Sequence, residues 1–535
     1  MRKIRAALGF ILILGLLIGC GPKEGTLEYF IDNLDARKSA DRIKAVKEIA
    51  RLAEEGAPGV NKAVQPIIQF FKDNVDDEAK EQAAIALGKL RDKSAVGTMC
   101  EWLTESAKID QTKVNNRSRA LALGLGEIGD PSAIDTLLKV VESSAEDSVK
   151  RTAITALGKL KAVKAVDSLI KVVLDDGENL LTRQRAILAL GDIGDAKAAD
   201  ALVYSLFVED RGISLNEYAN KAIHRLGPAA VPKLIETLQG KNQKVIDYIK
   251  LHPSWPKGVM ENKAMLTLGD LGDQRATEHI LKAMEERDYQ ILGSMALMFL
   301  QDKKAVPKLV ELTKKYKTGK IQFGEVQQIS SALSKIYAPE ESIPVFFDVA
   351  GAELEKYAAD FGRFQIMMEL SKLVHTPEQC DKWLEMAKKD IDKDAQKWYE
   401  KEGKPRVEAA KECGLKYDCW AKKLQDKDPF VRERAVLELG RSGDVKYLDT
   451  LLGKPLEDGE TCVSGYRLCE ACPPIQSICV REAMVDALLK LGPKDPKKAV
   501  DALEKRLEED KNRSTFKKVG FRYSVVRWFL KHKIK

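Results

Sequence analysis

The chain has 535 residues, of which 44% are hydrophobic, 6% aromatic and 32% charged, and its formal net charge is +7. A single hydrophobic core stops growing near about 250 to 300 residues, so this length and the scarcity of aromatic residues exclude one thick globular core and favour a thin helical stack. Residues 2–5 contribute three positive charges and residues 511–535 contribute nine, which leaves the body between them at about −5. Nucleic-acid binding through a uniformly basic surface is therefore not expected.

The first twenty residues follow the order of a secretory signal. A basic stub at residues 2–5 precedes an apolar run from Ala6 to Gly19, and Cys20 comes directly after it. The run is about fourteen residues long, whereas a helix that crosses a bilayer needs about twenty. We therefore expect residues 1–19 to be a cleaved signal peptide and residues 20–39 to form the start of the mature chain and a linker.

The segment Leu17-Ile18-Gly19-Cys20 resembles the lipobox of bacterial lipoprotein precursors. The resemblance implies that the chain is cut before Cys20, that Cys20 carries a diacylglycerol thioether, and that its new amino group is acylated, for example with palmitate. Two or three acyl chains make a stable membrane anchor. Gly21 stands where Asp favours inner-membrane retention, so the resemblance implies a cell-envelope protein, with the outer membrane favoured, that faces the periplasm or the cell surface. The alternative is an ordinary cleavable signal in which Cys20 falls by chance.

The mature chain is built from repeats. Segments such as "EDSVKRTAITALGKL", "LLTRQRAILALGDIG" and "PFVRERAVLELGRSG" share one pattern, and the motif glycines Gly126, Gly158 and Gly191 recur at 32 and 33 residues. Apolar residues three and four positions apart predict a helix with one apolar face. The motif glycine indicates a close helix crossing or the last turn, because Gly costs about 1 kcal/mol relative to Ala inside a helix. Helix caps are predicted at Asp76, Glu146, Asn179 and Asp428, and left-handed helix ends at Gly129, Gly194, Gly272 and Gly443.

This pattern resembles HEAT repeats, in particular the short subtype that also occurs in phycobilin lyase proteins. The resemblance implies an all-α fold, a right-handed α-α superhelical solenoid of about eleven helix pairs, in which the "VR…ALG" helices line the concave side. We expect an N-terminal solenoid over residues 40–287, divergent repeats with an insertion over residues 288–420, and C-terminal repeats over residues 421–510. Each pair buries its apolar face only against its neighbours.

Two interruptions of the repeat are candidate functional segments. In residues 248–260, Trp255 lies between two prolines, which bar a regular helix; it is either an aromatic anchor for a partner or a cover for the adjacent helix. Residues 381–420 are expected to form a divergent helix pair with a lengthened connection, in which Cys413 and Cys419 can form a local disulfide. The basic residues Lys150 and Arg183 of the repeat motif are further candidate partner contacts.

A third interruption, residues 453–479, contains Cys462, Cys469, Cys472 and Cys479. We expect two disulfides, because export places the thiols in an oxidising compartment, and the spacing does not fix the pairing. A zinc or iron–sulfur site, or a redox function of the C-x-x-C pair, are the alternatives. The basic, aromatic residues 511–535 are expected to cap the last repeat; binding to an anionic membrane is the other interpretation.

No catalytic constellation is recognisable in the sequence. The five histidines do not follow metal-ligand spacing, and no nucleophile elbow, P-loop or dinucleotide fingerprint occurs. We therefore expect no catalytic residue, bound metal or cofactor. The leading hypothesis is a membrane-anchored scaffold that binds an unknown protein or peptide on the concave surface of the solenoid. The alternatives are a lyase-like enzyme that attaches a ligand to a protein, and redox or metal chemistry at the cysteine cluster.

Overall fold

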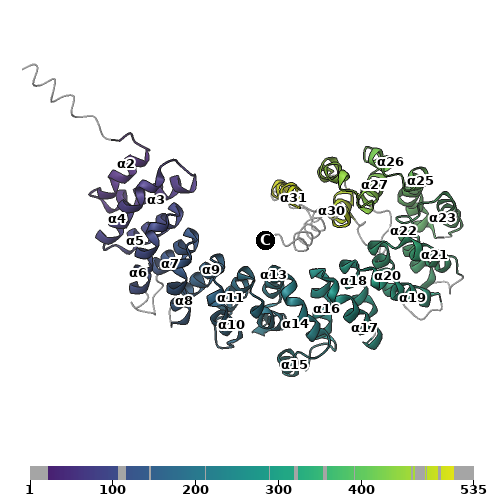
Figure 1. Cartoon of the computed structure of the whole chain (residues 1–535), viewed down its shortest axis with the longest axis horizontal. Coiled ribbons are helices and arrows are strands. Elements are labelled where there is room, and N and C mark those ends of the chain that lie inside the picture. The colour runs from purple at the N-terminus through teal and green to yellow at the C-terminus, as the bar shows by residue number, and fades with distance from the viewer. Residues whose placement is uncertain are drawn as a thin grey trace, which may run out of the picture. The chain divides into compact units, whose positions relative to one another are not determined.

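The structure is a computed structural model, shown in Figure 1. It describes residues 22–106, 116–143, 146–210, 212–287, 289–317, 323–352, 358–390, 392–458, 462–463, 476–477, 479–491 and 496–510. The predicted signal peptide, Cys20 and the basic segment 511–535 lie outside these ranges. Within them, no helix has the length and apolar character needed to span a membrane.

The chain divides into two units, residues 1–229 and residues 230–535. The division falls inside the segment 40–287 that the sequence analysis treats as one solenoid. Each unit is made of helices, and its only paired strands within the described residues form a two-residue antiparallel hairpin: β1 (Glu209–Asp210) with β2 (Ile213–Ser214), and β3 (Cys462–Val463) with β4 (Gln476–Ser477).

The first unit, coloured purple to teal in Figure 1, is a stack of helix pairs. Its helices are α2 (Leu27–Asp32), α3 (Ser39–Glu54), α4 (Val64–Asp73), α5 (Asp77–Leu90), α6 (Val96–Ser106), α7 (Asn116–Ile128), α8 (Ile134–Glu142), α9 (Asp147–Lys159), α10 (Val166–Leu174), α11 (Leu180–Ile193), α12 (Ala199–Ser205) and α13 (Asn216–Leu226). From α3 onward the odd-numbered helices carry the repeat motif and pack on one another; we call them the inner helices of this unit.

The second unit continues the same kind of stack. Its helices are α14 (Val231–Leu238), α15 (Gln243–Lys250), α16 (Val259–Leu271), α17 (Thr277–Arg287), α18 (Gln290–Leu300), α19 (Val306–Tyr316), α20 (Phe323–Ile336), α21 (Pro339–Ala350), α22 (Ala358–Leu370), α23 (Pro377–Lys389), α24 (Lys393–Trp398), α25 (Lys404–Cys413), α26 (Tyr417–Lys423), α27 (Pro429–Arg441), α28 (Leu448–Leu452), α29 (Lys454–Glu457), α30 (Cys479–Leu491) and α31 (Lys497–Asp510). Here the inner helices are α16, α18, α20, α22, α27 and α30. A π-helical turn, Tyr399–Gly403, joins α24 to α25.

The predicted helix ends are confirmed. The four predicted cap side chains each accept hydrogen bonds from backbone N–H groups in the first turn of their helices. The four predicted terminal glycines have φ between 65° and 78°, in the left-handed region. At the corresponding place in other repeats, Arg91, Lys161, Gln301 and Tyr337 adopt φ between 49° and 62°. The turn is therefore kept even where a side chain makes the left-handed conformation costly.

The motif glycines lie at close crossings between consecutive inner helices. A Cβ atom added to Gly126 would lie 2.9 Å from the Cα of Ala156, and one added to Gly191 would lie 2.6 Å from the Cα of Ala222. The same contact recurs in the second unit, where a Cβ on Gly440 would lie 2.4 Å from the Cα of Ala487. Small residues thus let the inner helices approach backbone to backbone, while the outer helices of successive pairs contact one another less. The predicted all-α solenoid fold is confirmed, and in each unit the motif helices pack on one another.

Candidate functional site

The inner helices of the first unit expose a regular strip of side chains. The residue three positions before each motif glycine is apolar or Thr and at least partly exposed: Ile85, Leu123, Thr155 and Leu188. These residues come from α5, α7, α9 and α11, and Leu123 is 38% exposed. We call them the inner strip.

Charged residues of alternating sign flank the inner strip. The position after the motif glycine, or its equivalent in α3 and α13, holds Glu54, Lys89, Glu127, Lys159, Asp192 and Arg225 in successive repeats. Lys89 lies 3.1 Å from Glu54 and 3.8 Å from Glu127. Arg225 lies 2.7 Å from Asp192. The apolar strip is therefore bordered by charges that neutralise one another, which leaves the face without a strong field of one sign.

The two basic candidates for partner contact are engaged inside the first unit. Arg183 is 2% exposed; its Nε donates to the carbonyl oxygen of Val173 over 3.0 Å, and its guanidinium lies 3.3 Å from Asp176. Lys150 forms an ion pair with Glu178, and both side chains are largely buried. These contacts tie the inner helices to the segment that follows α10. Such placement does not favour direct contact with a partner.

Trp255 folds back onto its own unit. Its ring centroid lies 4.9 Å from that of His252 and 6.1 Å from that of Tyr248, and the Nζ of Lys263 lies 5.4 Å from the Trp255 ring. The ring is partly exposed and bridges the end of α15 to α16. This arrangement matches the interpretation of Trp255 as a cover for the adjacent helix.

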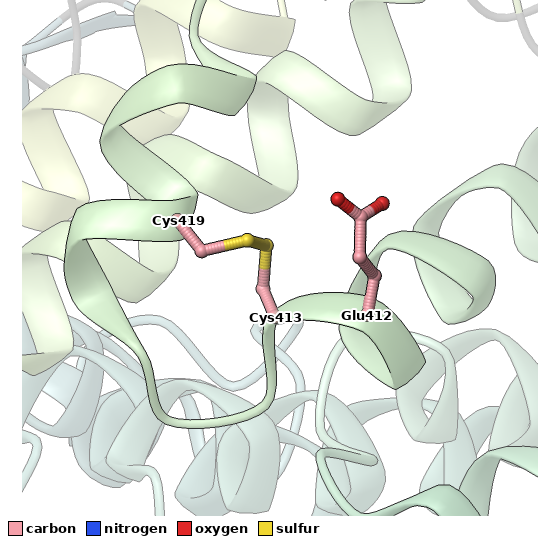
Figure 2. A group of neighbouring side chains, drawn as sticks. All are labelled: Glu412, Cys413 and Cys419. Carbon is pink, nitrogen blue, oxygen red and sulfur yellow. A yellow bond between two sulfur atoms is a disulfide. The ribbon is translucent and has the colours of Figure 1, made fainter.

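The structure joins Cys413 and Cys419 in a disulfide, with their Cα atoms 5.4 Å apart (Figure 2). Glu412 lies beside this pair, and the three side chains are close enough to be metal ligands. Two sulfur atoms bonded to each other are not thiolates, and the Glu412 carboxylate forms an ion pair with Lys423 at 2.6 Å. The oxidised group therefore does not fit a metal ion.

The cysteine cluster is only partly described. Cys479 is disulfide-bonded and buried at the start of α30. Cys469, Cys472 and the side chain of Cys462 lie outside the described residues, so the two predicted disulfides remain a prediction. Cys380 is a buried free thiol, and burial raises its pKa to about 11.

A polar cavity of about 290 Å³ lies among the inner helices of the second unit. Four cationic and four acidic side chains line it, together with serines and apolar residues. The charged lining residues are Lys335, Lys372, Arg441, Lys490, Glu369, Glu433, Glu482 and Asp486. Sequence reasoning did not find this cavity.

Long-range polar contacts hold the cavity walls together. Lys335 of α20 lies 2.7 Å from Asp486 of α30, and Lys490 of α30 donates to the carbonyl oxygen of Ile336 over 3.1 Å. Arg441 of α27 donates to the carbonyl oxygen of Lys372 over 2.7 Å. The last inner helices therefore lie against inner helices that precede them by about 70 to 150 residues in sequence.

A buried ion pair supports the wall formed by α27. Arg434 is fully buried, lies 2.8 Å from Glu438, and donates to the carbonyl oxygens of Ser371 and Val374 over 2.8 Å and 3.0 Å. Arg441 lies 2.6 Å from the same carboxylate. Each charge is thus compensated, as buried charges must be.

Comparison with known proteins agrees with this geometry. A family model described as HEAT repeats matches residues 110–182 and 149–211. Residues 110–211 contain HEAT repeats. This confirms the prediction for that part of the sequence and agrees with the helix pairs seen on either side of it. No curated protein matches this chain significantly.

Several solved structures are similar to this chain. The complex of CpcE and CpcF of phycocyanin lyase from Nostoc sp. PCC7120 is 20% identical over 53% of this chain and 90% of that one, with a TM-score of 0.24. Human deoxyhypusine hydroxylase is 20% identical over 51% and 94%, with a TM-score of 0.22. The Kap95:Nup1 complex is 12% identical over 95% and 77%, with a TM-score of 0.43. Similarity at this level concerns the fold and says nothing of activity or partners.

Proposed function

We propose that the protein is an exported lipoprotein, anchored through Cys20 in the bacterial cell envelope, whose HEAT solenoid serves as a scaffold that binds a protein partner. The inner strip of the first unit is the observation that carries the binding part. Its residues, three apolar and one Thr, come from four consecutive inner helices, and charged residues of alternating sign border them. Solenoids use such extended inner surfaces for binding.

The anchor rests on the sequence of residues 1–20, with its basic stub, short apolar run and Leu-Ile-Gly-Cys segment. The Cys413–Cys419 disulfide supports an oxidising compartment, since such bonds are rare in a reducing cytosol. Gly21 favours the outer membrane, by the same resemblance that identifies the lipobox.

The alternative functions gain no support from the geometry. The similarity to phycocyanin lyase is one of fold and says nothing of activity. Cys413 and Cys419, the cysteine pair that is fully described, form a disulfide and therefore offer no thiolate to bind a metal ion. The scaffold therefore remains the function that the described surfaces support best.

Replacement of Cys20 tests the anchor. In the native envelope, Cys20→Ser should block lipidation and cleavage before residue 20, so the protein should carry no acyl chain and keep its signal segment. Intact-mass measurement of the purified wild type should show a Cys20 amino terminus carrying acyl chains. A wild-type mass without lipid, or a variant that partitions and is processed as before, contradicts the lipoprotein.

Charge substitutions on the inner strip test the scaffold. Leu123→Glu and Leu188→Glu each place a carboxylate within the strip, so each should weaken co-purification of the cross-linked partner at least tenfold. Val163→Glu is the matched control, because Val163 is 60% exposed in the turn before the outer helix α10. Equal partner recovery from all three variants, at unchanged circular dichroism, would refute binding through the inner strip.

A further inference from the structure

The polar cavity of the second unit is separate from the inner strip and has its own chemistry. It is lined from α18, α20, α22, α27 and α30 and has a volume of about 290 Å³. This is enough for one long side chain or a small molecule, and it lies near the lower end of the range for ligand pockets, about 300 to 1,000 Å³.

The charged residues of the lining already have partners, with one exception. Lys335 pairs with Asp486, Lys372 with Glu369, Arg441 with Glu438 and Glu433 with Arg406, and Lys490 donates to the carbonyl oxygen of Ile336. Glu482, one turn before Asp486 on α30, has no hydrogen bond or ion pair with any side chain or backbone group in the described part of the unit. Its carboxyl is the one acidic group of the lining left without a counter-ion there.

The surroundings of Glu482 combine a buried hydroxyl group with apolar side chains. Ser334 lines the same cavity, is 5% exposed, and its hydroxyl has no hydrogen-bond partner. Met298, Leu437 and Ala483 supply apolar wall. Burial raises the pKa of the Glu482 carboxyl to about 7, because water is withdrawn from it and the nearby Lys335 compensates only in part.

We propose that this cavity receives the cationic side chain of a lysine or arginine of a protein partner, with Glu482 as its counter-ion and the Ser334 hydroxyl as a hydrogen-bond acceptor. The apolar wall suits the aliphatic stem of such a side chain. The proposal rests on the proposed scaffold function and specifies the chemistry of the partner.

Other ligand classes fit less well. An anion would meet Lys335, Lys372 and Arg441 already held in ion pairs, and it would lie beside the Glu482 carboxylate. A divalent metal ion needs several oxygen ligands, whereas one unpaired carboxylate and one hydroxyl are offered. A monovalent organic cation satisfies both unpartnered groups at once.

Binding should depend on pH, because only the ionised carboxylate attracts the cation. The charged groups facing Glu482 are Lys335 from α20, Glu369 and Lys372 from α22 and its following turn, Glu433 and Arg441 from α27, and Asp486 and Lys490 from α30. With the pKa of Glu482 near 7, the ionised fraction rises about tenfold between pH 6 and pH 8. The affinity for a cation should rise by about the same factor.

The test uses the full mature chain with ¹³C-labelled methionine methyl groups, since Met298 lines the cavity and can be assigned through Met298→Leu. The probes are the capped peptides acetyl-Gly-Arg-Gly-amide and acetyl-Gly-Lys-Gly-amide, and the isosteric neutral control has citrulline in place of arginine. A single side chain should bind at about millimolar concentration. We expect a saturable shift of the Met298 methyl signal with both cationic peptides at pH 8, about tenfold weaker binding at pH 6, and no saturation with citrulline.

Two variants and one small cation make the result decisive. Glu482→Gln should abolish the shift, whereas Glu340→Gln, which removes an exposed carboxylate of α21 in the same unit, should leave it unchanged. Both should melt at or above the wild-type temperature. No saturable shift, a shift that survives Glu482→Gln, or equal binding of citrulline would overturn the proposal. Agmatine carries the guanidinium group of arginine without a peptide backbone. If agmatine bound more tightly than the arginine peptide, the proposal that the cation belongs to a protein partner would be overturned. A negative result leaves the inner-strip variants unaffected, so failure of this site is distinguishable from failure of the scaffold function.

Discussion

Gly191→Ala introduces a single methyl group at the crossing between α11 and α13. The added Cβ would lie 2.6 Å from the Cα and 3.0 Å from the carbonyl oxygen of Ala222. Both atoms belong to the backbone of the neighbouring inner helix, so no side-chain rotation relieves the contact. The two helices must move apart, and the packing around them must open.

Two effects of opposite sign determine the magnitude. Gly→Ala inside a helix gains about 1 kcal/mol of helix propensity. Overpacking against a rigid neighbour costs about 1 to 3 kcal/mol. The steric effect should win at Gly191, because the contact is with backbone, and the difference between the two terms is a net loss of up to about 2 kcal/mol. Gly97 on the outer helix α6 is the matched control: a Cβ there meets no atom within 4 Å, so Gly97→Ala should be neutral or stabilise by up to about 1 kcal/mol.

Urea unfolding followed by circular dichroism measures both variants, with hydrogen exchange in α11 and α13 as a local readout, because long repeat arrays depart from two-state unfolding. Gly191→Ala should lower the midpoint and accelerate exchange in both helices. Gly97→Ala should do neither. If both substitutions stabilise the protein alike, the reasoning that places the motif glycines at obligatory close crossings is wrong.

Three further perturbations follow from the second unit. In paired thermal melts, Glu482→Gln should stabilise the protein by about 1 to 2 kcal/mol at pH 8 and change its stability little at pH 4.5. The raised pKa of Glu482 favours the protonated carboxyl in the folded state, and the stability that this contributes is lost as the pH rises from 4.5 through 7. Stabilisation at pH 4.5 but not at pH 8 would contradict a raised pKa. Arg434→Met should lower the free energy of unfolding, measured in urea, by about 3 kcal/mol. This is the low end for a broken buried ion pair, because Arg441 still neutralises Glu438. An unchanged urea midpoint would argue against the burial of this pair. Cys413→Ser with Cys419→Ser should cost about 2 kcal/mol in urea unfolding, as expected for a short closed loop; an unchanged midpoint would argue that the bond is absent.

The sequence predicts the local features of the repeat well. Asp76, Glu146, Asn179 and Asp428 were expected as caps and act as caps, since a cap depends on residues two or three positions away. The motif glycines were expected at a close crossing or a last turn, and the crossings are observed. These features follow from the spacing of residue types along one helix pair.

Features that depend on how distant repeats meet could not be predicted. Lys335 and Asp486 are 151 positions apart, and no pattern in the sequence brings α30 against α20. Within one repeat, the motif did not show that the long side chain of Arg183 reaches the carbonyl oxygen of Val173 and is buried; its role as a partner contact stays a prediction. By contrast, the alternating charges beside the inner strip could have been predicted from the sequence, because the residue after the motif glycine alternates in sign from Lys89 to Asp192.

The most direct test of the scaffold is a map of partner contacts on the native, lipid-anchored protein. A photo-reactive amino acid at Leu123 or Leu188, on inner helices, is compared with one at Lys171, which is exposed on the outer helix α10. Irradiation in the intact envelope should join the same partner protein to both inner positions and leave the outer position without an adduct. Adducts at Lys171 in the absence of adducts at Leu123 and Leu188 would contradict a binding surface on the inner helices.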